Sequence, residues 1–116
     1  MDENFSLIPI SADMPEGTDF CLIMDTELME PLIAKGSRLC VSRHQDPEPM
    51  DVGLFFYRGR VLCRQVCEDY AGNLHLLCAN PKAEKENLCL DRKERSHCLC
   101  LGRVLLREKP PAPVYV

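Results

Sequence analysis

The sequence predicts a single, mostly β domain of antiparallel hairpins, and three observations lead to this fold class. Apolar residues occur in short runs of strand length, such as residues 19–25 and 52–58, without the 3.6-residue spacing of an amphipathic helix. Glycine-containing turns at Gly59 and Gly72 separate consecutive runs. The length of 116 residues fits one domain, which buries roughly two thirds of the surface of its unfolded chain.

The first half of the chain predicts two strands joined by a compact connection. The apolar runs DFCLIMD at 19–25 and RLCVSR at 38–43 have the length of strands. Between them, the segment MEPLIAKG at 29–36 has room for about one or two helical turns. Pro31 is tolerated only in the first turn of a helix, and Gly36 provides a stop signal. We therefore expect one short helical turn here.

The second half predicts two hairpins in succession. The aromatic run VGLFFYR at 52–58 is followed by Gly59 and then by RVLCRQVCEDY at 60–70, which should return beside it as an antiparallel strand. Gly72 and Asn73 form the next turn, so the run NLHLLC at 73–78 adds a further strand.

The remaining residues predict a charged connection and a last long strand. Residues 81–96 are rich in charge and should loop around a short strand at Leu88–Leu90. The run HCLCLGRVLLRE at 97–108 is a strand that contains Gly102, which indicates a β-bulge or a close approach of another backbone.

Three segments are expected along the chain. Residues 1–18 form an N-terminal extension, residues 19–107 form the domain, and residues 108–116 form a proline-rich tail that is extended or lies at a sheet edge. The first ten residues are acidic with only a short apolar patch, so they resemble neither a signal peptide nor a membrane anchor. We expect no contact with a membrane.

Charge and cysteine content restrict the classes of partner. The formal net charge of −4 argues against direct binding of a nucleic-acid backbone, so any DNA is contacted through a separate domain. The eight cysteines are scattered through apolar runs, which is typical of cysteine used as a small core residue. We expect reduced thiols, a cytoplasmic location, and neither metal nor cofactor.

The order of several short motifs resembles the C-terminal domain of LexA-like and lambdoid phage repressors, a signal-peptidase-like family of Ser–Lys self-cleaving proteins. These motifs are MEP at 29–31 followed by Gly36, then NP at 80–81 and GRV at 102–104. The resemblance covers residues 19–106, most of the chain. It implies a β-clip-type fold of hairpins and a bacterial or phage regulator.

In that family a Gly-Asp-Ser-Met-Glu-Pro turn presents the nucleophilic serine, and a lysine on a later strand deprotonates it. The resemblance places Thr26 at the glycine, Glu27 at the aspartate and Leu28 at the serine. The rest of the motif is present as Met29, Glu30 and Pro31. Arg64 falls at the lysine, or Gln65 if the register shifts by one residue.

Each replacement removes a group that a Ser–Lys dyad needs for catalysis. Leucine offers no nucleophile, and arginine stays protonated in proteins and cannot serve as the base. Ser37 lies beyond the turn, and the lysines, at 35, 82, 85, 93 and 109, lie outside the hairpin strand. We therefore expect no peptidase activity. Glu27 and Glu30 either pair with Arg64 or are solvated, and the sequence leaves both interpretations open.

The resemblance implies a catalytically degenerate domain that works by association. It would serve as a homodimerisation and regulatory module of a transcriptional regulator with a helix-turn-helix domain, and its cleft would hold a peptide or protein. The last strand or the tail is expected at or near the dimer interface. Two alternatives remain: an active self-cleaving peptidase whose dyad lies elsewhere, and a stand-alone protein-interaction module.

Other groups of potential ligands and nucleophiles in the sequence have simpler interpretations. A zinc site is conceivable from His97, Cys98, Cys100, Cys63 and Cys67, but strong zinc signatures pair two CxxC-like turns, and core packing of the thiols is favoured. Cys63 lacks a neighbouring base that would make it a displaced nucleophile. His44 and His75 are expected to be surface residues and not ligands.

Overall fold

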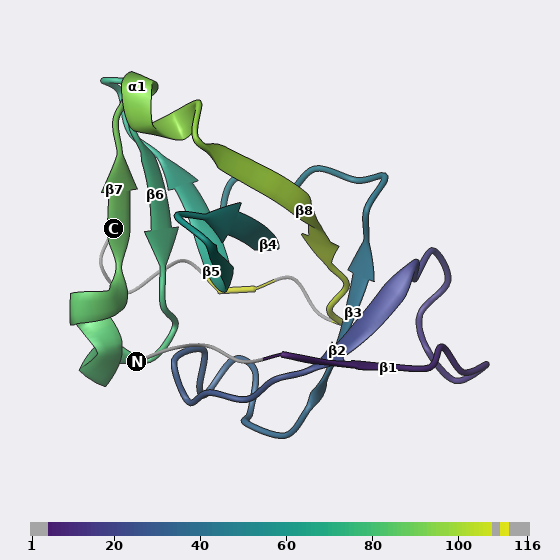
Figure 1. The fold of residues 1–116 in the computed structure, drawn as a ribbon. Helices are drawn as coiled ribbons and strands as arrows, with labels where there is room; N and C mark the ends of the chain where they lie inside the picture. The colour runs from purple at the N-terminus through teal and green to yellow at the C-terminus, as the bar shows by residue number, and fades with distance from the viewer. Residues whose placement is uncertain (1–4, 108–109, 112–116) are drawn as a thin grey trace.

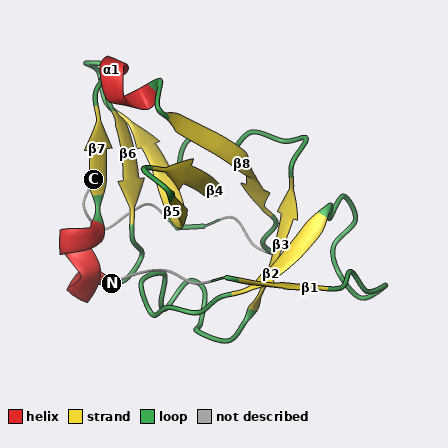
Figure 2. Ribbon diagram, viewed as in Figure 1, coloured by secondary structure: helices red, strands yellow, loops and turns green. Residues whose placement is uncertain are grey.

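The computed structural model describes residues 5–107 and 110–111, and over these residues the protein is mostly β (Figures 1 and 2). Eight strands form one antiparallel sheet, and the only helices in this part of the chain are two short ones. The elements in chain order are β1 (Ser6–Ile8), β2 (Phe20–Ile23), β3 (Arg38–Ser42), β4 (Val52–Tyr57), β5 (Arg60–Glu68), β6 (Leu74–Leu77), the 3-10 helix η1 (Pro81–Glu86), β7 (Leu88–Leu90), α1 (Arg92–Arg95) and β8 (Cys98–Val104).

The strand order in the sheet is β1-β2-β3-β8-β4-β5-β6-β7. Most neighbours in space are also neighbours in sequence, joined as hairpins. β8 is the exception, because it is the last strand along the chain yet lies between β3 and β4 (Figure 1). The expected mostly β class is therefore confirmed, and the centre of the sheet is completed by a long-range pairing.

The seven strands predicted from apolar runs are present with ends shifted by a few residues. The prediction missed β1, which pairs with β2 through residues 6–8 and brings part of the expected N-terminal extension into the sheet. Most of the expected tail lies outside the described residues. The expected helical turn at 29–36 is reduced to a single hydrogen bond of helical spacing, from the Ile33 N–H to the Met29 carbonyl (2.8 Å).

The two short helices lie in the segment that was predicted to be a charged loop, so that prediction was wrong in detail. The Asn80 side chain accepts a hydrogen bond from the Lys82 N–H (3.0 Å) and caps η1, which has Pro81 in its first turn. Asp91 caps α1 by accepting from the Glu94 N–H (2.9 Å). Side-chain caps of this kind satisfy N–H groups that the first helical turn leaves open.

Alternate residues of the central strands pack into two apolar clusters. The first cluster gathers residues of β2, β3 and β4 with Met24, Met29 and Cys63. The second lies against β5, β6 and β7 and contains Phe55, Leu62 and others. Because successive side chains of a strand point to opposite faces, β4 contributes to both clusters.

Gly102 produces the predicted bulge and the predicted close approach. The pairing of β8 with β4 shifts between Leu54 and Phe55, which face Gly102 and Cys100, so Leu101 is the extra residue. Gly102 has a φ of 149°, and a Cβ atom there would lie 2.5 Å from the carbonyl oxygen of Ser42. Only glycine allows β3 and β8 to meet this closely.

Within the described residues, no helix is long and apolar enough to cross a membrane.

Candidate functional site

The turn that the resemblance aligns with the catalytic serine is well ordered by its own contacts. Leu28 has only 6% of its surface exposed, so its side chain points into the protein. Thr26 is also buried, and its Oγ1 accepts a hydrogen bond from the Leu28 N–H (3.3 Å). The Thr26 hydroxyl, the only one in the turn, thus satisfies a backbone N–H group of the same turn.

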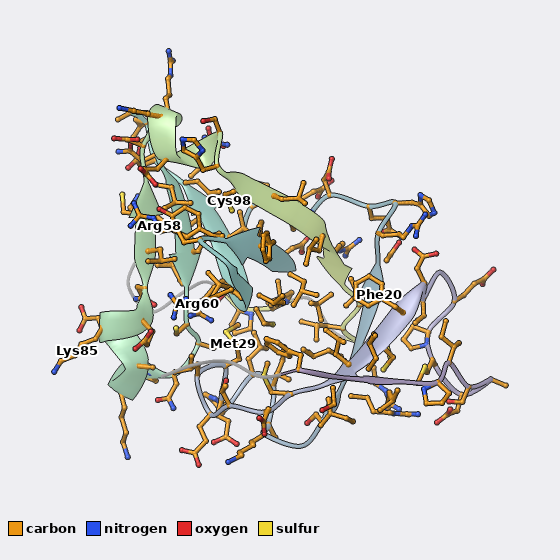
Figure 3. All side chains as sticks on the ribbon, viewed as in Figure 1. Phe20, Met29, Arg58, Arg60, Lys85 and Cys98 are labelled. Atoms are coloured by element: carbon orange, nitrogen blue, oxygen red, sulfur yellow. The ribbon has the colours of Figure 1, made fainter. Side chains whose placement is uncertain are left out.

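Asn80 fixes this turn from a distant part of the chain. Its backbone N–H donates to the Leu28 carbonyl (3.0 Å), and its Nδ2 donates to the Glu27 carbonyl (2.9 Å). Met29, on the other side of Leu28, is fully buried in the first cluster, where the labelled side chain can be followed in Figure 3. These bonds and this packing hold the turn in one conformation.

An open groove of about 430 Å³ lies beside the turn. Its walls combine the turn with η1, and they carry acidic and basic side chains in similar number. The three lysines among them are exposed. The lining residues are Asp25, Thr26, Glu27, Leu28, Lys35, Asn80, Lys82, Ala83, Lys85 and Glu86.

Arg64, the residue aligned with the lysine base, does not line this groove. Its side chain is fully buried, and Nη1 donates to the carbonyl of Cys63 (2.9 Å). Strand alternation places Arg64 on the side of β5 that carries Leu62 and Val66, two members of the second cluster. The structure therefore does not bring Leu28 and Arg64 together around one groove.

Gln65, the alternative position for the base, has a structural role. It is 2% exposed, and its Nε2 donates to the carbonyls of Met50 (2.8 Å) and Pro111 (2.7 Å). An amide that holds two backbone segments in this way provides no proton acceptor for catalysis.

The suggested pairing of Arg64 with the two glutamates is not seen. The Glu30 carboxylate accepts a hydrogen bond from the Lys35 N–H (3.1 Å), and Glu27 is exposed. No ion pair of the described residues joins either glutamate to the buried Arg64. Pro31, the last residue of the motif, is exposed and follows Glu30 through a cis peptide bond.

The cysteines considered for a zinc site are divided between the two faces of the sheet. Cys98 and Cys100 pack against the second cluster, whereas Cys63 is buried in the first. The structure therefore does not bring this set together. Complete burial of Cys63 also removes it as a displaced nucleophile.

A different group of polar side chains was not recognised in the sequence. His75 was expected to be a surface residue, but it is partly buried and lies between Asp69 and Cys89. His44, by contrast, is exposed as expected and lies 3.9 Å from Asp19. The predicted turn between β5 and β6 is the feature of the sequence that could have indicated this group, because the turn brings Asp69 back beside His75.

A search against the models of known protein families finds none that matches this chain, and no curated protein matches it.

Proposed function

We propose that this protein is a catalytically inactive relative of the LexA-like and phage-repressor C-terminal domains, with a β-clip-type fold, that acts by association. It would form homodimers in the cytoplasm, hold a peptide or protein segment in the groove beside Leu28, and serve a transcriptional regulator whose DNA-binding domain is separate. The observation that carries the proposal is the buried Leu28 at the position of the nucleophile.

The position of the base supports the same proposal. A Ser–Lys dyad needs a neutral amine close to the hydroxyl. Arg64 is a buried guanidinium outside the groove, and the lysines that line the groove are exposed. The Thr26 hydroxyl is engaged with the Leu28 N–H. The residues of this turn and groove therefore give no support to the alternative of an active dyad.

The groove supports a role in binding an extended segment of chain. Lys35, Lys82 and Lys85 lie on its walls together with Asp25 and Glu27, so the groove presents both signs of charge to a polar peptide. Its turn is held by Asn80 and by the packing of Met29, so the binding surface is formed in advance. A small-molecule site would be more enclosed.

The absence of catalysis can be tested by alkaline incubation, which promotes self-cleavage in the resembled family by favouring the neutral lysine. We expect the wild-type chain, incubated with a peptide that carries an Ala-Gly bond, to leave both the peptide and itself intact by mass spectrometry. Leu28→Ser alone and Arg64→Lys alone should behave in the same way, because each restores only one half of a dyad.

Circular dichroism of each variant is the control for folding, since Leu28→Ser removes a buried side chain and is expected to cost about 2–5 kcal/mol of unfolding free energy. Cleavage at one defined bond by the unmodified protein would contradict the proposal and favour the alternative of an active peptidase.

Dimerisation is expected to use an exposed apolar face of the central strands β4 and β8. Phe56 of β4 and Leu99 of β8 lie directly opposite each other and are 43% and 59% exposed. We expect light scattering to show a dimer at concentrations on the order of 10 µM. Leu99→Asp should shift the protein to monomer, because a charge would be buried in an apolar contact.

Leu7→Asp is the matched control, since Leu7 is an exposed leucine (74%) on the edge strand β1, away from the proposed contact. A monomeric wild type, or equal dissociation by both substitutions, would argue against the proposed interface.

A further inference from the structure

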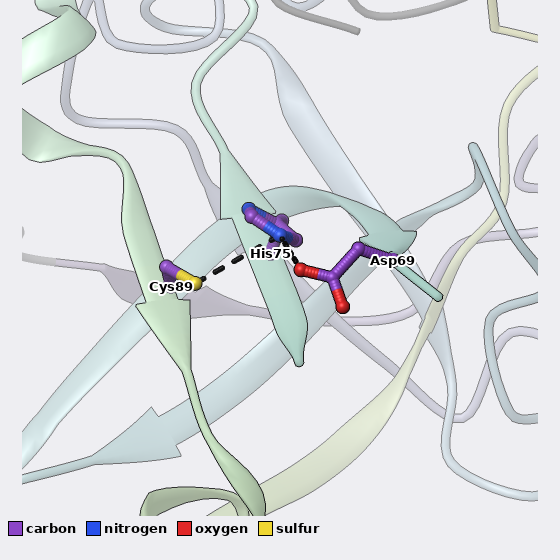
Figure 4. A group of neighbouring side chains, drawn as sticks. All are labelled: Asp69, His75 and Cys89. Carbon is purple, nitrogen blue, oxygen red and sulfur yellow. Dashed lines mark hydrogen bonds and ion pairs between the residues drawn. The ribbon is translucent and has the colours of Figure 1, made fainter. Parts of the chain in front are cut away.

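We propose that Asp69, His75 and Cys89 form a binding site for Zn²⁺. Their ligand atoms all lie within 4.8 Å of one another. The Oδ2 atom of Asp69 is 2.8 Å from Nε2 of His75, and the Sγ atom of Cys89 is 3.8 Å from the same nitrogen (Figure 4). The inference is independent of the function proposed for the groove, and it reverses the expectation that the protein uses no metal.

The sheet brings the three residues together from separate elements. His75 on β6 and Cys89 on β7 are direct partners in the antiparallel register, so their side chains leave the same face side by side. Asp69 directly follows β5, at the turn that leads into β6. The site thus lies across β6, β7 and the turn that follows β5, near the β7 edge of the sheet.

The carboxylate is oriented before any metal binds. Oδ1 of Asp69 accepts hydrogen bonds from the N–H groups of Ala71 (2.9 Å) and Asn73 (3.0 Å). Oδ2 accepts from Nδ2 of Asn73 (3.0 Å) and faces His75. Contacts that fix the direction of a ligand in this way are the usual support of a protein metal site.

The arrangement differs from a catalytic Cys-His-Asp triad. In a triad, the nucleophile and the acid contact opposite nitrogens of the imidazole, so that one nitrogen accepts a proton while the other donates. Here the thiol and the carboxylate both approach Nε2 of His75. A single nitrogen cannot serve both partners as a triad requires, whereas three donors that converge on one space suit a metal ion.

The distances are close to those that zinc imposes. Zn²⁺ bonds of about 2.0–2.2 Å to nitrogen and oxygen and about 2.3 Å to sulfur, in tetrahedral geometry, separate N and O by about 3.3 Å and N and S by about 3.6 Å. The present values are 2.8 Å and 3.8 Å. Zinc binding therefore requires the ligand atoms of Asp69 and His75 to move apart by about 0.5 Å and the Cys89 thiol to move slightly closer to His75.

The donor set and its charge also favour zinc. Imidazole, thiolate and carboxylate are all common zinc ligands, whereas Ca²⁺ and Mg²⁺ prefer oxygen alone. The Cys89 thiol loses its proton when it binds, so the thiolate and the Asp69 carboxylate together balance the two charges of the ion. Cys89 is exposed, which gives an ion access from solvent and leaves the fourth coordination position to water.

The test uses the full chain, purified with reductant and stripped with a chelator. Zn²⁺ is titrated against a chromophoric competitor, and Co²⁺ is used as a spectroscopic probe. We expect one equivalent of Zn²⁺ per chain, a thiolate-to-cobalt charge-transfer band, and a higher melting temperature with zinc. Cys89→Ser, His75→Ala and Asp69→Asn should each weaken zinc binding roughly tenfold or more, and Cys89→Ser should also remove the band.

Cys98→Ser is the control, because Cys98 is a partly buried thiol that packs against the second cluster. It should bind zinc as the wild type does. Since Cys89 is exposed, Cys89→Ser should keep the fold, and circular dichroism checks this. The proposal is overturned if the wild type shows no saturable binding, or if Cys98→Ser weakens binding while Cys89→Ser does not.

Discussion

Gly102→Ala is expected to lower the free energy of unfolding by about 3 kcal/mol or more. The added methyl group would lie 2.5 Å from the Ser42 carbonyl oxygen, 2.8 Å from Cγ1 of Val41 and 3.0 Å from Cα of Arg43. Two of these atoms belong to the backbone of the β3 end, so the clash can be relieved only by moving β3 away from β8. The φ of 149° adds backbone strain, because residues with a Cβ atom rarely adopt it.

Urea denaturation measures this loss, and Gly36→Ala is the matched control. Gly36 also has a positive φ, of 90°, but a Cβ atom there meets nothing within 4 Å. It should cost only the backbone strain, about 1–2 kcal/mol. Equal losses of unfolding free energy for the two substitutions would mean that the close approach of β3 and β8 contributes little to the effect of Gly102→Ala.

Arg64→Ala is expected to cost about 3–5 kcal/mol of unfolding free energy. Arg64 is the largest of the fully buried side chains in the described part of the chain, so its removal leaves a cavity. It also removes the guanidinium donor of the Cys63 carbonyl. Arg64→Met should recover part of the loss, because methionine fills much of the space and adapts to an irregular cavity.

The control for charge is Arg38→Ala. Arg38 forms a 2.8 Å ion pair with Asp13, but both side chains are largely exposed (42% and 64%). An exposed ion pair contributes little to stability, so this substitution should change the denaturation midpoint little. A loss for Arg64→Ala no larger than that for Arg38→Ala would show that Arg64 is not a stabilising part of the core.

Much of the sheet could be predicted because its strands are short apolar runs separated by glycine turns. At the hairpin between β4 and β5, Arg58 and Gly59 both have positive φ, the conformation that favours a two-residue turn. β1 was missed because three residues in a mixed segment give too little alternation to recognise. The cap of α1 was readable, since Asp91 stands three residues before Glu94.

The residue types at the candidate site could be predicted from the sequence, but their arrangement in space could not. The replacements Leu28 and Arg64 are visible in the sequence once the turn is aligned. Whether β5 reaches the groove depends on tertiary packing, so the position of Arg64 outside the groove was not predictable. The Asp69, His75 and Cys89 group depends on the register of β7 against β6, which are separated by η1.

The position of β8 has a consequence for synthesis on the ribosome. β3 and β4 are consecutive along the chain but are not bonded to each other, and β8 alone joins them. Until β8 leaves the exit tunnel, the nascent chain can form only two separate half-sheets, each with a bare inner edge that can pair with another chain. The pairing of β8 with β3, which joins the two half-sheets, links residues far apart in the sequence. We therefore infer that the two half-sheets form before this pairing.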